Sequence, residues 1–222
     1  MANRFWIVFG DIHERISAVG RIDDIGRASG VFLSGDLTNI GTRERAAGIL
    51  DAVTTLNPVV RAQIGNMDTT AVERVLNERG VNVHTQVSDL GGGVCLAAVG
   101  YSTPTPFGTP SEVDEAQICQ WAHDVLEAAG AYERVILMIH TPPRGEVVDR
   151  LPSGAHVGSS GVRALIEKYQ PDVVVTGHIH EGAGEERIGR SHVLNPGAFA
   201  AGGYVRIDET PEGLAACLRS VS

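Results

Sequence analysis

The sequence predicts an α/β protein in which helices cover largely parallel strands. Apolar, β-branched runs alternate with segments of helical periodicity over residues 4–79. The valine run at 173–175 is typical of a strand that is buried on both faces. Such alternation favours parallel strands joined by helical crossovers. Polar residues that can bind metal ions follow strand after strand, which indicates a site at the carboxyl ends of the strands.

The individual elements follow from these patterns. Strands are expected at 4–10, 31–35, 59–65, 81–87, 93–100, 134–140 and 172–177, with shorter ones at 191–195 and 204–207. Helices are expected at 15–28, 43–56, 70–79 and 160–170. A further helix is expected to begin at Thr109, because Thr109-Pro110-Ser111-Glu112 has the form of a capping box with proline at the first helical position. Its apolar stripe ends at Gly130, a natural stop. The Gly91-Gly92-Gly93 run is expected to form a turn, because no helix follows it to make a phosphate loop.

Length and composition favour a single domain over residues 1–222. Of the 222 residues, 43% are apolar and 20% are charged, which is ordinary globular usage. We find no linker, repeat or low-complexity segment that would divide the chain.

Several classes of protein are disfavoured. There is no apolar run long enough to span a bilayer and no signal peptide, so we expect a cytoplasmic protein that does not bind membranes. The three cysteines form no CxxC pair, which argues against a thiolate zinc site and a disulfide scaffold. The net charge of −9 and the absence of a basic stripe argue against stable nucleic-acid binding. The sequence leaves the oligomeric state open, a homo-oligomer included.

Five expected strands end in oxygen or imidazole ligands. In the stretch "VVVTGHIH", His178 and His180 are two positions apart and would point into one space in an extended chain. A chance pair of histidines explains this stretch alone equally well, but five strand ends in agreement favour one site. The candidates are Asp11, His13, Asp36, Asn39, Asn66, Asp68, His140, His178 and His180.

This set is too large for one first-row metal ion and suits two. The ligands are imidazoles, carboxylates and an amide, with no thiolate. Such mixed ligation suits Mn, Fe, Zn, Co or Ni better than Mg alone, and we place Mn first. Two cations need a bridging carboxylate, for which Asp36 is the candidate. Asn39 is expected to serve a turn or cap instead.

The segments "GDIH", "GDLTN", "GNMD", "MIH" and "GHIH" occur in an order that resembles the calcineurin-like metallophosphoesterase superfamily. The "NPG" at 195–197 resembles a loop of its small prokaryotic members. The resemblance implies a four-layer α/β/β/α sandwich and a two-metal site. It implies one metal on Asp11, His13, Asp36 and His180, and a second on Asp36, Asn66, His140 and His178.

The implied activity is hydrolysis of a small phosphodiester by in-line attack of a metal-bridging hydroxide. A phosphomonoesterase or protein phosphatase on the same site is an alternative, although no extra arginine or histidine marks a pocket for a monoester dianion. A non-catalytic scaffold with the same fold is another, although all seven ligand positions carry competent residues. The expected partner is a small phosphorylated substrate, and Phe107 in the loop "YSTPTPFGTP" is a candidate to stack on a base or aryl group.

The resemblance breaks at Met67, where the family usually has a histidine thought to protonate the leaving group. A thioether cannot donate a proton. A good leaving group, a bound water or another residue could compensate, and His156, in a long loop, is the first candidate. Its alternative is a cap for the following helix. Asp68 is expected either to orient His140 or His178, or to cap the helix near residue 70.

Overall fold

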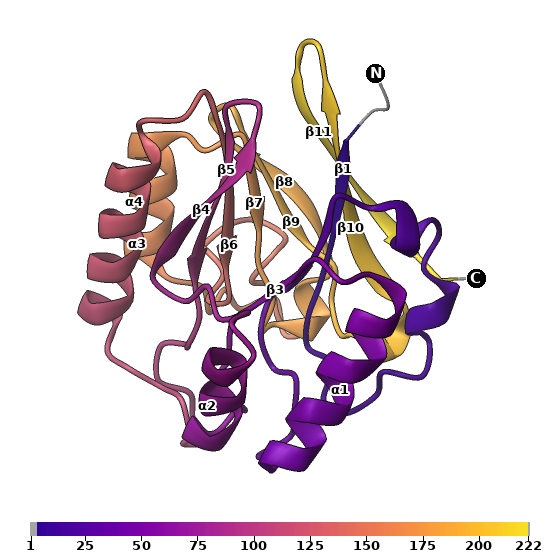
Figure 1. Cartoon of the computed structure of the whole chain (residues 1–222). Helices are drawn as coiled ribbons and strands as arrows, with labels where there is room; N and C mark the ends of the chain where they lie inside the picture. The colour runs from indigo at the N-terminus through magenta and orange to yellow at the C-terminus, as the bar shows by residue number, and fades with distance from the viewer. Residues whose placement is uncertain (1–3, 222) are drawn as a thin grey trace.

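The computed structural model describes residues 4–221 and shows two β-sheets packed face to face between two layers of helices (Figure 1). One sheet has the order β11-β10-β1-β2-β3, and the other has the order β4-β5-β6-β7-β9-β8. The predicted four-layer α/β/β/α sandwich is therefore confirmed. The strands are β1 (Phe5–Phe9), β2 (Gly30–Leu33), β3 (Val60–Ala62), β4 (Gln86–Gly91), β5 (Val94–Val99), β6 (Arg134–Ile139), β7 (Val173–Val175), β8 (Gly184–Ile188), β9 (Ser191–Asn195), β10 (Gly203–Thr210) and β11 (Gly213–Ser220).

Alternating side chains of β1 hold the layers together. Trp6 and Val8 point between the sheets, where they join a cluster with residues of β5, β6 and β7. Ile7 and Phe9 point to the opposite face and join the cluster under the helices α1 (Arg43–Leu56) and α2 (Thr70–Glu78). Because successive side chains of a strand point to opposite faces, a strand between two apolar layers must be apolar at every position.

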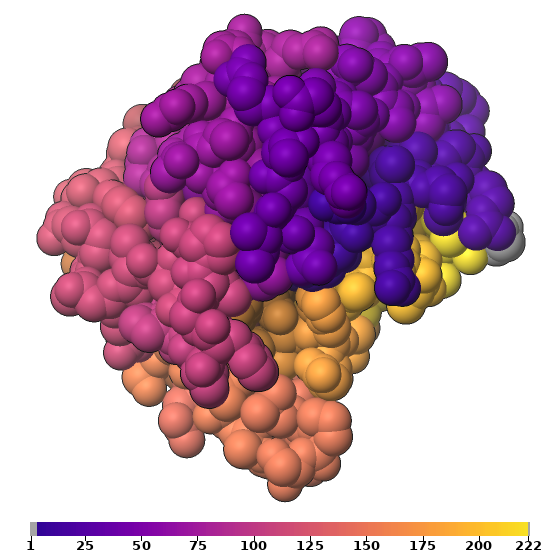
Figure 2. Space-filling view, turned by 90° about the horizontal axis from the view of Figure 1, so that it is seen from below, coloured from indigo at the N-terminus to yellow at the C-terminus, as the bar shows by residue number. Residues whose placement is uncertain are grey.

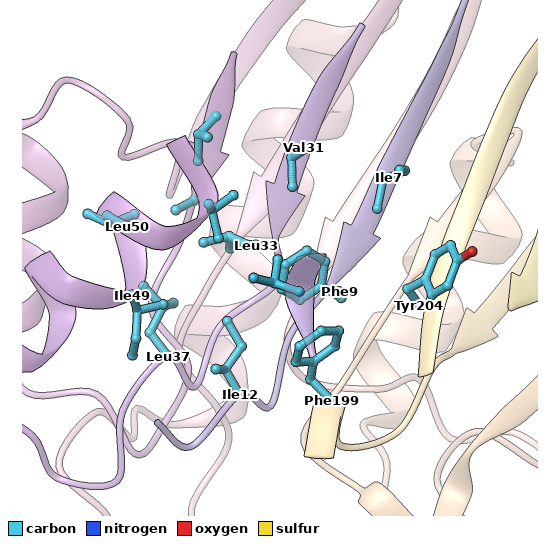
Figure 3. Close-up of a cluster of buried hydrophobic side chains, with 14 of the residues drawn as sticks. Ile7, Phe9, Ile12, Val31, Leu33, Leu37, Ile49, Leu50, Phe199 and Tyr204 are labelled. Atoms are coloured by element: carbon cyan, nitrogen blue, oxygen red, sulfur yellow. The ribbon is translucent and has the colours of Figure 1, made fainter. Parts of the chain in front are cut away.

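The outer face of the first sheet is closed by one apolar cluster (Figure 3). Phe9 at the end of β1 stacks on Phe199, with ring centroids 4.5 Å apart. Ile49 and Leu50 of α1 contribute to the same cluster. The second sheet is covered in the same way by α3 (Glu115–Ala129) and α4 (Ser160–Tyr169). Among the described residues, no helix is long and apolar enough to cross a membrane.

The expected helix at 15–28 is wrong. The segment forms two short 3-10 helices, η1 (Val19–Arg21) and η2 (Ile25–Arg27), and Asp24 between them has a left-handed φ of 57°. The buried residues recur every third position, which is the period of a 3-10 helix and not of an α-helix. They are Val19, Ile22, Ile25 and Ala28.

The helix expected at Thr109 begins only at Glu115. Asp114 is its N-cap, and the Asp114 carboxylate accepts a hydrogen bond from the backbone N–H of Gln117. Glu112 does accept from both the N–H and the hydroxyl of Thr109. The segment is nevertheless drawn away from helical geometry, because Ser111 bonds to Asn66 and Asp68 carbonyls at the site.

One strand boundary also differs. The strand expected at 81–87 begins only at Gln86, since Thr85 has a φ of 57° and His84 lies in a turn. The strand β8 had no sequence prediction. The glycine run joins β4 to β5, and Gly91, Gly92 and Gly93 all have positive φ, so the predicted turn is confirmed.

Candidate metal centre

The predicted ligands meet where the parallel strands end. β1, β2 and β3 are parallel neighbours in one sheet, and β5, β6 and β7 are parallel neighbours in the other. The carboxyl ends of both sets therefore open at the same end of the sandwich. Figure 2 views this end and shows segments of the first third of the chain against the orange segments of the last third.

Asp36 occupies the centre of the cluster. Its Oδ1 accepts a 2.7 Å hydrogen bond from the backbone N–H of Met67. Its Oδ2 lies 3.8 Å from His13 Nε2 and 3.6 Å from His140 Nε2. One carboxylate oxygen is thus fixed by the backbone while the other faces imidazoles on both sides, as a bridging ligand requires.

Asp11, His13 and His180 form the first group. Their ligand atoms all lie within 4.8 Å of one another. His180 Nε2 lies 3.2 Å from Asp11 Oδ1 and 3.1 Å from His13 Nε2. Three ligand atoms that converge on one point, two of them imidazole nitrogens, are a geometry that suits a cation.

Asn66, His140 and His178 form the second group. Asn66 Oδ1 lies 3.1 Å from His140 Nε2 and 2.7 Å from His178 Nδ1. Asn66 Nδ2 donates to the hydroxyl of Thr109 at 2.9 Å, which keeps the amide oxygen turned toward the imidazoles. His140 Nδ1 lies 3.0 Å from the carbonyl oxygen of Ser34, so that the proton belongs on Nδ1 and the Nε2 lone pair faces the site.

The backbone at these positions is strained. Asp11, His13, Asp36 and His178 have φ values of 48°, 45°, 50° and 69°. Non-glycine residues rarely occupy this left-handed region, and each costs on the order of 1 kcal/mol. Four residues of one cluster share the strain, which is typical of sites where side chains must be aimed at a common point.

Two glycines of the motifs allow the close approach of the ligands. A Cβ on Gly65 would lie 2.2 Å from Asp36 Oδ1, and a Cβ on Gly177 would lie 2.5 Å from Asp11 Oδ2. No side chain fits at either position without moving a carboxylate. In Gly65-Asn66 and Gly177-His178, the second residue is therefore a candidate ligand, and the glycine before it leaves space for the carboxylate of Asp36 or Asp11.

The electrostatics favour a positive charge at the centre. Burial lowers the pKa of His140, but the charge of Asp36 outweighs it and raises this pKa to about 9. Burial, aided by the charge of His140, lowers the pKa of His178 to about 4. Burial works against ionisation of Asp11, yet the hydrogen bond from His180 and the nearby imidazoles hold its pKa below the usual value.

Asp68 braces the site loops and does not contact the predicted histidines. Its carboxylate accepts hydrogen bonds from the backbone N–H groups of Leu37, Thr38 and Gly65 and from the Thr38 hydroxyl. It does not cap α2 either, whose N-cap is Thr69. Burial and the charge of Asp36 raise the pKa of Asp68 to about 7. Asp68 joins the loop of Asp36 to the loop of Asn66, a role that needs contacts between distant segments and leaves no signal in the local sequence.

His156 lies in the long loop between β6 and α4. Its Nδ1 is 2.8 Å from Asp149 Oδ1. Leu151 and Val157 of the same loop line the cavity over the cluster, whereas His156 is not among its lining residues. A role as acid stays a prediction. Thr109, which orients Asn66, is the site residue that the sequence did not indicate.

A cavity of about 650 Å³ lies over the cluster. It is lined by His13, Asp36, Ile40, Asn66, Met67, Thr103, Pro104, Thr105, Pro106, Phe107, Gly108, Thr109, Leu151, Val157, His178, Ile179, His180 and Glu181. The candidate ligands form one part of the lining, and apolar side chains form much of the rest.

A family model described as "Metallophosphoesterase, calcineurin superfamily" matches residues 116–214. The matched span contains His140, His178 and His180. An uncharacterised protein of Methanocaldococcus jannaschii is 28% identical over 193 residues, which cover 84% of each chain.

Two solved structures share the fold over nearly the whole chain. A Thermus thermophilus protein superposes with a TM-score of 0.75 at 19% identity and covers 100% of both chains. A dimetal phosphatase from Danio rerio superposes with a TM-score of 0.66 at 12% identity and covers 99% of both. The family match and the shared fold together cover the five strand ends from which the candidate ligands project.

Proposed function

We propose that the chain is a metal-dependent phosphoesterase of the calcineurin-like metallophosphoesterase superfamily, and that it is a phosphodiesterase that hydrolyses a small phosphodiester. The proposal has two parts, which are a two-metal site and a preference for diesters over monoesters. The alternatives are a phosphomonoesterase or protein phosphatase that uses the same site, and a non-catalytic scaffold with the same fold.

The residues present fit two divalent transition-metal ions. Asp11, His13, Asp36 and His180 would hold one ion, and Asp36, Asn66, His140 and His178 the other. The support is the donor set itself, in which imidazole nitrogens and carboxylate oxygens converge at 3.1–3.8 Å. Mixed nitrogen and oxygen ligands suit Mn²⁺, which we propose first, ahead of Fe, Zn, Ni and Co.

When bound, two such ions supply Lewis acidity that ionises a water and offsets charge on the phosphoryl oxygens. The residues of the chain position that chemistry. Asp36 faces both halves of the cluster, and the Ser34 carbonyl fixes the tautomer of His140. Met67 lines the cavity, but its thioether offers no proton to a leaving group. A substrate with a good leaving group is therefore favoured.

The observation that carries the diester preference is the charge of the cavity wall. Among the described residues that line the cavity, none is Lys or Arg, and Glu181 adds a carboxylate. A monoester is a dianion near neutral pH, whereas a diester carries one negative charge. A wall without cations beyond the metal cluster suits the less charged substrate.

The test is hydrolysis of bis(p-nitrophenyl) phosphate beside p-nitrophenyl phosphate, on chelator-stripped protein with and without Mn²⁺. We expect Mn²⁺-dependent turnover that favours the diester. His178→Ala should remove metal and activity while the fold persists. His192→Ala is the matched control, because His192 pairs with Glu185 away from the cluster. Faster monoester turnover would support a phosphatase, and wild-type turnover in His178→Ala would contradict the metal assignment.

We further propose a small phosphorylated substrate, and neither a membrane nor a stably bound nucleic acid as partner. The single domain over 1–222 and the cytoplasmic location stay predictions from the sequence, and the oligomeric state stays open.

A further inference from the structure

Most of the exposed large apolar side chains among the described residues lie at the candidate site. The described residues include five exposed large apolar side chains, which are Ile40, Val59, Phe107, Val147 and Val157. Ile40, Phe107 and Val157 all line the cavity over the cluster. Phe107 is 86% exposed and Ile40 is 60% exposed. Exposed apolar groups that collect in one place mark a binding surface, whereas scattered ones do not.

These three side chains come from three different loops. Ile40 follows β2, Phe107 follows β5, and Val157 lies between β6 and α4. Met67, Leu151 and Ile179 add further apolar surface to the same lining. We call this set of six residues the apolar wall. It borders the cavity that also contains His13, Asp36 and His178, so that a molecule held at the cluster extends along the wall.

The loop that carries Phe107 is fixed by a partly buried hydrogen-bond network and tied to a candidate ligand. Glu112 accepts hydrogen bonds from Thr105 Oγ1 and from both the N–H and the hydroxyl of Thr109. Thr109 accepts from Asn66 Nδ2, and Thr105 Oγ1 accepts from the N–H of Phe107. Although burial opposes ionisation of Glu112, these hydrogen bonds lower its pKa to about 2. The position of Phe107 is therefore set relative to Asn66 before any substrate arrives, which lowers the entropy cost of binding.

The charges of the cavity restrict what the apolar wall can hold. No Lys or Arg is present among its described lining residues, and Glu181 lies beside Ile179. A second phosphate or carboxylate on the substrate would meet a carboxylate and no cation there. An uncharged apolar group would instead remove apolar surface from water on both partners.

We infer that the site takes monoanionic phosphodiesters in which one ester group is apolar, either alkyl or aryl, and that Phe107, Ile40 and Val157 contact this group. The inference rests on the proposed function, because the phosphoryl group is placed at the metal cluster. It names the substrate class and the side chains that select it.

The experiment measures binding and needs no turnover. Methyl-, n-butyl- and n-hexyl-(methyl)phosphinates are monoanions that resemble a diester and have no ester bond to cleave. Their affinities for the Mn²⁺-loaded protein are measured by isothermal titration calorimetry. Full burial of one methylene strengthens binding about fourfold. On a wall that leaves about half of the chain in water, each methylene should strengthen binding about twofold. We therefore expect the hexyl compound to bind roughly 30-fold more tightly than the methyl compound.

Single substitutions locate the effect. Phe107→Ala should reduce the hexyl-to-methyl ratio to below about tenfold, and it removes few native contacts because the side chain is so exposed. Val157→Ala should reduce the ratio by a smaller factor. Val59→Ala is its matched control, since Val59 is 43% exposed, Val157 is 44% exposed and Val59 lies outside the cavity.

Two results would overturn the inference. One is an affinity that does not rise with chain length, or a rise that Phe107→Ala leaves intact. The other is a wild-type dimer in sedimentation that Phe107→Ala converts to a monomer, which would make the wall a contact between two copies. A chain-length effect without any diester turnover would support the binding preference and count against the phosphodiesterase proposal alone.

Discussion

His84 precedes β4 and His140 directly follows β6 of the same sheet, and burial acts to lower the pKa of both, yet the two pKa values end far apart. His84 lies against Trp121 and Tyr101, with ring centroids 4.7 and 5.0 Å away, and burial lowers its pKa to about 4. His140 is fully buried, yet Asp36 raises its pKa to about 9. His84 Nδ1 accepts a hydrogen bond from the N–H of Gly100, so its lone pair is used within the fold. The charge of Asp36, and not the degree of burial, therefore separates the pKa of His140 from that of His84.

Asp36→Asn should have the largest effect, because it removes the charge that raises the pKa of His140 and faces both halves of the ligand cluster. The amide cannot bridge two cations, so we expect metal content to fall and kcat/KM for a diester to drop at least about 10³-fold. Metal analysis after dialysis and turnover at a fixed Mn²⁺ concentration measure both. Asp51→Asn is the control, since Asp51 pairs with Arg79 on the surface. Full metal content and near wild-type turnover in Asp36→Asn would contradict the role of Asp36 as the bridging ligand.

Removal of the metal should lower the free energy of unfolding through the ligand cluster around Asp36, and not through His84. A ligand present at about 1,000 times its Kd stabilises the folded state by about 4 kcal/mol. Chelator-stripped protein should therefore unfold at lower urea than the Mn²⁺-loaded protein. His178→Ala should reduce the difference strongly, while a substitution at His84 should leave it unchanged. Equal shifts in the wild type and in His178→Ala would place the bound metal elsewhere.

The pH dependence of stability should report His84. Above pH 6.5 this imidazole is neutral in both states and contributes nothing. Between about pH 6.5 and 4 the unfolded chain binds a proton that the folded chain does not, so the free energy of unfolding falls as the pH falls. The loss approaches about 3 kcal/mol near pH 4 and stays constant below it.

His84→Asn isolates this contribution, because the amide oxygen can accept from Gly100 N–H but does not titrate. We expect the wild type to lose more stability than the variant when denaturant unfolding of metal-free protein is compared at pH 7 and pH 4. Parallel pH profiles would show that His84 is protonated in the folded state and that burial does not control it.

The same contrast explains what could be predicted from the sequence. The candidate ligands could be found because each lies just after an apolar strand, and parallel strands must end at a common edge. The resemblance to the metallophosphoesterases then assigned seven of them to metal ions. His84 falls in the segment 81–87 that was expected to be a strand, and the structure places it in a turn, where its partners Gly100 and Trp121 come from distant segments.

Other errors have the same origin in non-local contacts. The segment from Thr109 to Glu112 has the local pattern of a helix start, but Ser111 binds the backbone of the Asn66 loop and prevents it. Asp68 was assigned to a histidine or a helix end, whereas three backbone N–H groups of two loops hold it. Local sequence encodes where a strand ends, but it does not encode which loop a polar group will meet.

Thr109→Val should have the smallest effect, because it changes the orientation of the ligand Asn66 without removing a charge. Asn66 Nδ2 would lose its 2.9 Å acceptor, and the amide could turn its oxygen away from His140 and His178. Loss of such a supporting contact typically weakens metal affinity by about 10- to 100-fold, and we expect the lower end. A titration of Mn²⁺ into stripped protein measures this, and kcat at saturating metal should stay within about threefold of wild type.

Thr55→Val is the matched control, because the Thr55 hydroxyl bonds to the Asp51 carbonyl of α1. Unchanged affinity in Thr109→Val would mean that the imidazoles alone orient Asn66, and that the site depends less on the loop of Phe107 than its hydrogen bonds indicate.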